Sequence, residues 1–388
     1  MQFEFATAVR IVFGPGKLEE AAPAAASFGK RPLLVVDSLQ RAEPLIERLK
    51  AAGLDPVPFG VEGEPTIATV SAASQAARAA ACDLVIGFGG GSALDTAKAA
   101  AGLAVNPGDL FDYLEVVGAG RPLERPGLPF IAIPTTAGTG SEVTRNAVMT
   151  VPERRVKVSL RSPFLLARLA ILDPLLTLSL PPALTAATGM DALTQCLEPY
   201  VCNAPNPLIA PLCLDGIRRA ARALPRAVED GSDAAARQEM CLVSLFGGLA
   251  LANARLGAAH GLAGPIGGMF PAPHGAVCAR LLPEVTAVNL RALQSRQPES
   301  PALGRYAEIA HGVLEFPCLE DVSVGFQGVC EWLRALIEKL DIPPLRHYGL
   351  SPADFPSIVA QAQKASSMKG NPIPLTDEEL TEILQRAL

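Results

Sequence analysis

Short apolar runs alternate with longer helix-like segments in the first part of the chain, up to about residue 175. The runs that predict buried strands are residues 33–37, 84–88 and 130–134, and residues 55–59 are a weaker edge-strand candidate. The helix-like segments are residues 42–52, 66–81 and 95–104. Strands that are apolar throughout are typical of parallel sheets covered by helices on both faces. The pattern therefore predicts an α/β N-terminal domain with a parallel, Rossmann-like sheet.

After Asp173-Pro174 the pattern changes to long helical segments with few strand candidates. These segments are residues 183–201, 208–228, 234–254 and 322–340. Apolar positions at helical spacing over such lengths predict helices rather than strands. We therefore predict two domains, an α/β domain over residues 1–177 and an all-α domain over residues 178–388.

The composition favours a folded chain and argues against several classes of protein. With 388 residues, 49% of them hydrophobic and 19% charged, the chain is long enough for two domains and too apolar for a disordered protein. The net charge is −6 and no basic stripe is visible, so we expect no nucleic-acid partner. Because the sequence has no run of about 18 uncharged apolar residues and no signal-peptide pattern, we expect no membrane association and a cytoplasmic location.

Cysteine and histidine usage limits the side-chain chemistry that is available. The cysteines are scattered and form no CxxC pair, which predicts small buried hydrophobic residues rather than a disulfide framework or a metal motif. The eight are Cys82, Cys196, Cys202, Cys213, Cys241, Cys278, Cys318 and Cys330. Of the four histidines, His311 and His347 stand in isolation and are interpreted as structural or surface residues.

A glycine-rich segment, residues 87–98, joins a predicted buried strand to a predicted helix. Its glycines let the backbone turn sharply and approach a bulky anion, and the N–H groups at the start of the next helix suit a pyrophosphate. The segment matches neither the G-x-G-x-x-G nor the G-x-x-x-x-G-K-[ST] fingerprint. A strand-to-helix turn without a ligand is therefore the alternative interpretation.

A second loop after a buried strand, residues 134–144, gathers hydroxyl groups and glycines that can bind phosphate, ribose or amide groups. Loops at the carboxyl ends of neighbouring parallel strands share one crevice, the usual ligand position in open α/β sheets. Asp37 ends an earlier strand, where a carboxylate can bind the adenosine ribose and repel a 2′-phosphate, which favours NAD over NADP. A polar surface loop and an ordinary strand-end acid are the alternatives.

Four residues of the predicted helical domain could bind a metal. Asp191 and Gln195 share one helix face, and His260 and His274 lie beside glycines and prolines further on. Mixed oxygen and nitrogen donors suit a divalent ion and can leave a position for a substrate oxygen. Taken alone, these residues favour buried histidines with satisfied hydrogen bonds over a metal site.

Together, the motifs resemble the iron-containing (group III) alcohol dehydrogenase family over nearly the whole chain. They are Gly89-Gly90-Gly91-Ser92 with Asp95 and Lys98, the loop from Pro134-Thr135-Thr136 to Glu142, Ile171-Leu172-Asp173-Pro174, Gly189-Met190-Asp191, His260 with Pro273-His274-Gly275, and Lys369-Gly370-Asn371-Pro372 with Leu375-Thr376. The resemblance implies a dehydroquinate synthase-like fold, with an α/β dinucleotide-binding domain, an all-helical metal-binding domain and an active site in the cleft between them. It also implies a homodimer. The cofactor-binding residues expected here are Asp37, Gly89, Gly90, Gly91, Ser92, Asp95, Thr135, Thr136, Thr139 and Lys157.

The resemblance also implies a metal held by one Asp and three His. Asp191, His260 and His274 match three of these positions, and they are the expected catalytic residues. Gln195 stands at the fourth, so the expected ligand set is Asp191, Gln195, His260 and His274. A neutral amide oxygen is a weaker donor to Fe²⁺ or Zn²⁺ than imidazole, so metal affinity or selectivity should change. Gly264 stands where the family often has another histidine, which removes a candidate proton relay.

The function that follows is a metal-dependent, NAD(P)-linked alcohol dehydrogenase, or aldehyde or ketone reductase, acting on a small-molecule substrate. The metal, Fe²⁺ or Zn²⁺, acts as a Lewis acid on the substrate oxygen. The alternatives are a maleylacetate-type reductase, which need not use a metal, and a non-catalytic nucleotide-binding protein whose metal site is lost at Gln195. A lyase that recycles NAD, as dehydroquinate synthase does, is disfavoured because no Lys and Arg cluster lies near His260.

Overall fold

In the computed structural model, which describes residues 2–314 and 322–388, the chain divides into two compact units. The first, here called the sheet unit, comprises Phe5–Thr136 and Gly140–Leu178. The second, here called the helical unit, comprises Met1–Glu4, Ala137–Thr139 and Ser179–Leu388. Three residues of the loop predicted to bind cofactor therefore group with the helical unit.

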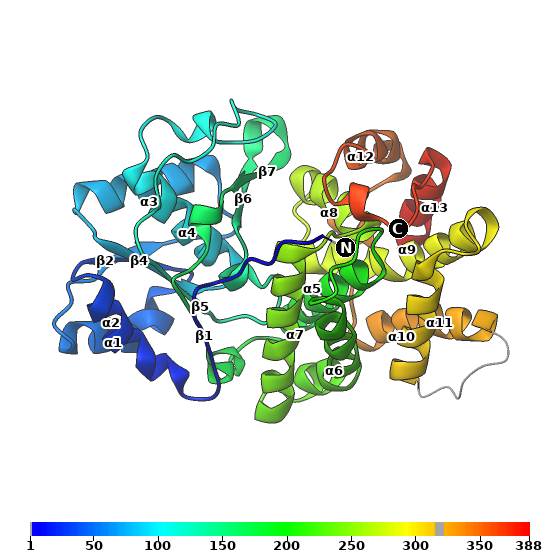
Figure 1. Cartoon of the computed structure of the whole chain (residues 1–388), viewed down its shortest axis with the longest axis horizontal. Coiled ribbons are helices and arrows are strands. Elements are labelled where there is room, and N and C mark those ends of the chain that lie inside the picture. Colours follow the sequence, from blue (N-terminus) through cyan, green and yellow to red (C-terminus); the bar gives the residue numbers. More distant parts are fainter. Residues whose placement is uncertain (1, 315–321) are drawn as a thin grey trace. The chain divides into compact units, whose positions relative to one another are not determined.

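Six parallel strands form the sheet of the sheet unit, in the order β1-β8-β5-β4-β2-β3 (Figure 1). They are β1 (Ile11–Phe13), β2 (Pro32–Val36), β3 (Val57–Gly60), β4 (Leu84–Gly89), β5 (Phe130–Pro134) and β8 (Leu169–Leu172). Every residue of β2, β4, β5 and β8 is buried, as expected for apolar strands covered on both faces, whereas the edge strand β3 is half exposed.

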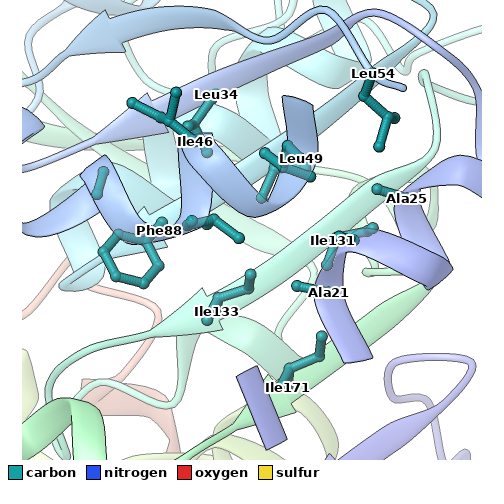
Figure 2. Close-up of a cluster of buried hydrophobic side chains, with 14 of the residues drawn as sticks. Ala21, Ala25, Leu34, Ile46, Leu49, Leu54, Phe88, Ile131, Ile133 and Ile171 are labelled. Carbon is teal, nitrogen blue, oxygen red and sulfur yellow. The ribbon is translucent and has the colours of Figure 1, made fainter. Parts of the chain in front are cut away.

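Helices cover both faces of this sheet. They are α1 (Ala21–Phe28), α2 (Leu39–Ala51), α3 (Ile67–Ala79) and α4 (Gly91–Val105). On the α1 and α2 side, Ala21, Ile46 and Leu49 pack in one core with Leu34, Phe88, Ile131, Ile133 and other strand residues (Figure 2). A separate antiparallel hairpin, β6 (Asn146–Val151) and β7 (Val156–Arg161), shares a second core with α3 and α4.

The strand order reverses between β2 and β4. From β2 the chain passes through α2 to β3 at the sheet edge, whereas from β4 it passes through α4 to β5 on the other side. The carboxyl ends of β2 and β4 therefore lie side by side at a topological switch point, where open α/β sheets bind their ligands.

The described part of the helical unit contains helices and no strands. They are α5 (Pro182–Val201), α6 (Ala210–Glu229), α7 (Ala234–Asn253), α8 (Ala258–Met269), α9 (His274–Arg296), α10 (Pro301–Leu314), α11 (Val322–Lys339), α12 (Phe355–Ala362) and α13 (Asp377–Ala387). α5 contacts α6, α7 and α9 and is buried along most of its length. The predicted fold class, a parallel α/β region followed by a helical region, is confirmed.

No single helix in the described part of the chain is long and apolar enough to cross a membrane, although α7 and α8, bent by 94° at their junction, pass that test together. Seven cysteines are buried and form no disulfide among the described residues, and Cys318 lies outside them.

Candidate cofactor and metal site

Asp37 and the glycine-rich turn meet at the switch point of the sheet unit. Asp37 directly follows β2, and its Oδ2 accepts a hydrogen bond of 2.9 Å from the backbone N–H of Gly90. A Cβ on Gly89, where φ is +155°, would lie 2.8 Å from this carboxylate, so the turn requires glycine. α4 starts at Gly91 without a side-chain cap, which leaves its N-terminal dipole suited to an anion. The structure thus places Asp37, Gly89, Gly90, Gly91 and Ser92 together.

The threonines that follow β5 lie beside this turn. The N–H of Thr135 donates to the carbonyl of Gly89 at 2.9 Å, and a Cβ on Gly90 would lie 3.3 Å from the methyl group of Thr136. The hydroxyl of Thr135 is buried without a hydrogen-bond partner among the described residues. Thr139 is not grouped with them, because it belongs to the helical unit.

Asp95 and Lys98 are engaged in contacts within the sheet unit. Asp95 Oδ2 accepts from the N–H of Val148 at 2.9 Å, and its Oδ1 lies 3.4 Å from Lys98 Nζ. Lys98 is buried and also donates to Ser141 and to others in the segment 141–146. Burial lowers the pKa of the Lys98 ammonium, although the Asp95 carboxylate opposes this. These contacts tie α4 to that segment, and a cofactor role for Asp95 stays a prediction.

Lys157, the other cofactor residue expected from the resemblance, lies on β7. Its Nζ forms an ion pair of 2.7 Å with Glu64 Oε1. Contact with a cofactor would compete with this pair, and that role also stays a prediction.

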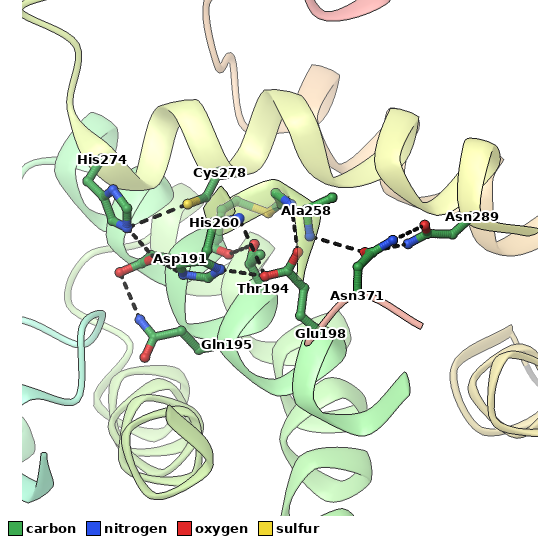
Figure 3. Close-up of polar contacts among 12 residues, drawn as sticks. Asp191, Thr194, Gln195, Glu198, Ala258, His260, His274, Cys278, Asn289 and Asn371 are labelled. Atoms are coloured by element: carbon green, nitrogen blue, oxygen red, sulfur yellow. Dashed lines mark hydrogen bonds and ion pairs between the residues drawn. The ribbon is translucent and has the colours of Figure 1, made fainter. Parts of the chain in front are cut away.

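Three potential metal ligands from three helices converge in the helical unit (Figure 3). Asp191 lies in the middle of α5, His260 near the start of α8, and His274 is the first residue of α9. Asp191 Oδ1 lies 3.5 Å from His260 Nε2 and 3.7 Å from His274 Nε2. This oxygen is buried, and it has no hydrogen-bond partner among the described residues. Buried polar atoms are normally satisfied, so such an atom between two imidazole nitrogens fits the place of a cation.

Cys278 joins this cluster and was missed as a functional residue in the sequence. Its sulfur lies 3.6 Å from His274 Nε2, and its donor atom and those of Asp191, His260 and His274 all lie within 4.8 Å of one another. Cys278 is buried, as predicted for the cysteines, but it faces imidazoles rather than apolar side chains. The spacing of four residues from His274 puts both on one face of α9, and this was the signal available in the sequence.

Glu198 was also missed, and it orients His260. Its Oε2 lies 2.6 Å from His260 Nδ1, and its Oε1 accepts from the N–H of Ala259 at 2.7 Å. Because a carboxylate accepts hydrogen bonds, Nδ1 carries the proton and donates, so Nε2 is the ring nitrogen turned toward Asp191. A carboxylate behind a histidine ligand is a common arrangement in metal sites. Asp191 and Glu198 are two helical turns apart on α5.

Gln195 lies beside Asp191 in a specific orientation. Its Nε2 donates to Asp191 Oδ2 at 3.0 Å and to the carbonyl of Gly138 at 3.4 Å. Figure 3 shows the amide nitrogen turned toward Asp191 and the oxygen turned away. That oxygen is buried and has no hydrogen-bond partner among the described residues. A ligand role for Gln195 stays a prediction.

The ionisable groups of the cluster shift one another's pKa values. Burial disfavours the charged forms, but the neighbours outweigh it and raise the pKa of His260 well above its usual value, mainly through Cys278 and Asp191. Burial would raise the pKa of Asp191, yet the close imidazoles of His260 and His274 leave it lowered. Without a metal, the acidic groups therefore hold a proton on His260. A divalent cation would replace it, because metal ligands bind deprotonated.

Comparisons with known proteins agree with this geometry. Residues 8–174 match the family described as iron-containing alcohol dehydrogenase, and residues 185–388 match the C-terminal part of the Fe-containing alcohol dehydrogenase family. The chain is 36% identical over 398 residues to long-chain-alcohol dehydrogenase 1 of Geobacillus thermodenitrificans (strain NG80-2), covering 97% of this chain and 96% of that protein.

Two solved structures show the same fold along the whole chain. The crystal structure of a 1,3-propanediol oxidoreductase superposes with a TM-score of 0.92 at 34% identity and covers 100% of both chains. The sulfoacetaldehyde reductase from Bifidobacterium kashiwanohense, in complex with NAD⁺, superposes with a TM-score of 0.86 at 28% identity and covers 99% of this chain and 98% of that one.

Fold, cluster and matches together define an oxidoreductase of the NAD(P)-linked alcohol dehydrogenase type. The chain belongs to the iron-containing alcohol dehydrogenase family. The family resemblance drawn from the sequence is thereby confirmed, and so is the enzymatic class.

Proposed function

We propose that the chain oxidises a small alcohol, or reduces the matching aldehyde or ketone, with NAD as hydride carrier and one divalent metal ion at the cluster. The observation that carries this proposal is the convergence of two imidazoles on the buried Oδ1 of Asp191, which accepts no hydrogen bond from the described residues. Asp191, His260 and His274 would hold the metal, and Gln195 and Cys278 compete for the fourth protein position. When bound, the metal supplies Lewis acidity to the substrate oxygen.

The side chains around the cluster fix its donors before substrate arrives. Glu198 holds His260 in one tautomer, and Gln195 occupies the second oxygen of Asp191, so that Oδ1 faces the imidazoles. Groups held in place by hydrogen bonds need little reorganisation during the reaction. His274 is the more accessible histidine, with 34% of its side chain exposed. We infer that substrate approaches from this side.

Proton transfer in this proposal does not use a side chain at position 264. A Cβ on Gly264 would meet no atom within 4 Å, so there is open space beside α8 where the family often has a histidine. A chain of water and ribose hydroxyl groups would carry the alcohol proton instead.

The acidic Asp37 supports NAD over NADP. Its carboxylate stands next to Gly90 at the start of the predicted pyrophosphate turn, where it would accept hydrogen bonds from ribose hydroxyls and repel a 2′-phosphate. Thr135, Thr136, Thr139 and Lys157 would complete the cofactor contacts.

Two measurements on the purified protein test this function. The first is metal analysis, and the second is an activity assay on a panel of alcohols, aldehydes and keto acids in which NAD(P)H absorbance is monitored. We expect a bound divalent metal and turnover with at least one small alcohol–carbonyl pair. Reduction of maleylacetate with no metal dependence would favour the maleylacetate-type reductase. Nucleotide binding without turnover of any substrate would favour a non-catalytic protein. We also expect a cytoplasmic location and a homodimer. Light scattering on the protein as it elutes from a size-exclusion column would test the homodimer.

A further inference from the structure

We propose that Cys278 is the fourth protein ligand of the metal, giving an Asp–His–His–Cys site that prefers Zn²⁺ to Fe²⁺. This inference rests on the proposed metal role of Asp191, His260 and His274. Nothing in the motif matches points to a cysteine here, and Cys278 follows only from the arrangement of α5, α8 and α9.

Three of the six separations among the four donor atoms are close to those of a tetrahedral site, and all six are at most 4.8 Å. With Zn–N and Zn–O bonds near 2.0–2.1 Å and Zn–S near 2.3 Å, ligand atoms should lie about 3.3 Å apart, or about 3.6 Å where one is sulfur. The separations of Asp191 Oδ1 from the two Nε2 atoms are 3.5 Å and 3.7 Å, and that of Cys278 Sγ from His274 Nε2 is 3.6 Å. The two O···N distances are too long for good hydrogen bonds, and all three distances are close to the edges of a ligand tetrahedron.

Gln195 is oriented for a different task. Its amide nitrogen faces two acceptors, the carboxylate of Asp191 and the carbonyl of Gly138. Turning the amide over would place its oxygen against both, so the hydrogen bonds fix the orientation. Gln195 therefore presents a donor to the cluster side, and its oxygen points away (Figure 3). These contacts fit a role for Gln195 in positioning the carboxylate of Asp191 better than a role as a metal ligand.

The sulfur of Cys278 is fully buried and lies among potential metal ligands. It lies 3.6 Å from His274 Nε2, and His260 is a second imidazole neighbour. An ionised thiol in such a place is expensive unless a cation compensates it, and a divalent metal would do so. Thiolate is a soft donor, which favours Zn²⁺ over the harder Fe²⁺ among the metals expected here.

Cobalt substitution tests this directly on the full-length chain. The protein is stripped with a chelator and reloaded with Co²⁺, whose bond to a thiolate gives a near-ultraviolet charge-transfer band that nitrogen and oxygen ligands do not give. We expect this band in the wild type and its loss in Cys278→Ala. Zn²⁺ affinity of Cys278→Ala, measured against a chromophoric chelator, should fall by more than about 100-fold, beyond the roughly 10–100-fold typical of losing a residue that only hydrogen-bonds to a metal ligand.

Two further variants separate the outcomes. Cys213→Ala removes another fully buried thiol, on α6, and should keep both the band and the affinity. Gln195→Ala should keep the band. A wild type that binds Co²⁺ without the sulfur band, or a Gln195→Ala that loses as much affinity as Cys278→Ala should, overturns the role of Cys278. If wild type binds no divalent metal at all, the proposed metal function itself is wrong.

Discussion

Asp37 is the residue on which our prediction of cofactor preference depends. Its carboxylate accepts a hydrogen bond from the N–H of Gly90 at the start of the turn that is predicted to bind pyrophosphate. We expect Asp37→Asn, which keeps an oxygen acceptor for Gly90, to raise the NADP-to-NAD ratio of kcat/KM by roughly 10- to 100-fold. The physical reason is that removing one charge repulsion near a surface is worth about 1–3 kcal/mol.

The matched control for Asp37 is Asp55→Asn, which removes an exposed acid from the same unit. It should leave the cofactor ratio unchanged. An unchanged ratio in Asp37→Asn would mean that the ribose lies elsewhere.

Glu142 makes the stability of the sheet unit depend on pH. Burial raises the pKa of Glu142 from 4.5 to about 7, although Lys98 and a backbone hydrogen bond oppose the shift. The native state therefore keeps a proton that the unfolded chain releases, so this stabilising contribution is complete below pH 4.5 and is lost as pH rises through about 7. We expect Glu142→Gln to be more stable than the wild type at pH 8 by about 3 kcal/mol, from about 1.4 kcal/mol per pKa unit.

Urea unfolding at pH 5 and pH 8 checks the Glu142 prediction. The exposed Glu153→Gln is the control and should follow the wild type at both values. A Glu142→Gln variant with no gain at pH 8 would show that folding does not raise the pKa of Glu142.

At the level of single residues, the sequence analysis identified the functional residues that belong to recognisable motifs. Asp191, His260 and His274 were expected from the family resemblance and lie together, and Asp37 lies beside the glycine turn. Cys278 and Glu198 were missed because each acts through helix packing, and neither belongs to a motif. Cys278 was interpreted as a small buried hydrophobic residue, and Glu198 was not singled out.

At the level of elements, Lys98 connects α4 to the segment that contains Ser141, Thr144 and Asn146. Lys98→Met removes the buried cation and leaves Asp95 and several oxygens without their donor. We expect a loss of about 3–5 kcal/mol in the free energy of unfolding, as for breaking one side of a buried ion pair. The KM for NAD should rise as well, because the loop after β5 loses its anchor.

Urea unfolding and initial rates at varied NAD measure both effects of Lys98→Met. Lys50→Met, at an exposed position on α2, is the control. Wild-type stability in Lys98→Met would contradict the anchoring role.

The elements found from the sequence are those with long or uniform patterns. The apolar runs became β2, β4 and β5, and the edge candidate became β3. The short strands β1 and β8 were missed because three or four residues carry too little pattern. The hairpin strand β6 alternates between half-buried and buried positions in the structure, but the apolar Val148 at a half-buried position interrupts this alternation in the sequence. α8 and α9 were missed as well, and their internal prolines do not explain this, because the predicted helices α5 and α6 also contain one.

At the scale of the whole molecule, the sequence predicted the order of a parallel α/β part and a helical part, and the family matches cover both. No single boundary in the sequence separates the two units. Ala137–Thr139 group with the helical unit, whereas the segments on both sides of them belong to the sheet unit. A linear pattern cannot reveal this, since it depends on contacts such as that between Gly138 and Gln195.

The most direct test of the account is Asp191→Asn, compared with the wild type for metal content, NAD binding and turnover. The variant keeps the shape of the side chain but removes the anion at the centre of the cluster. We predict a metal-depleted protein with unchanged NAD affinity and turnover lower by at least about 100-fold, because the Lewis acid is lost while the nucleotide site is intact. Wild-type turnover by Asp191→Asn, with or without metal, would contradict the claim that this cluster holds the catalytic metal.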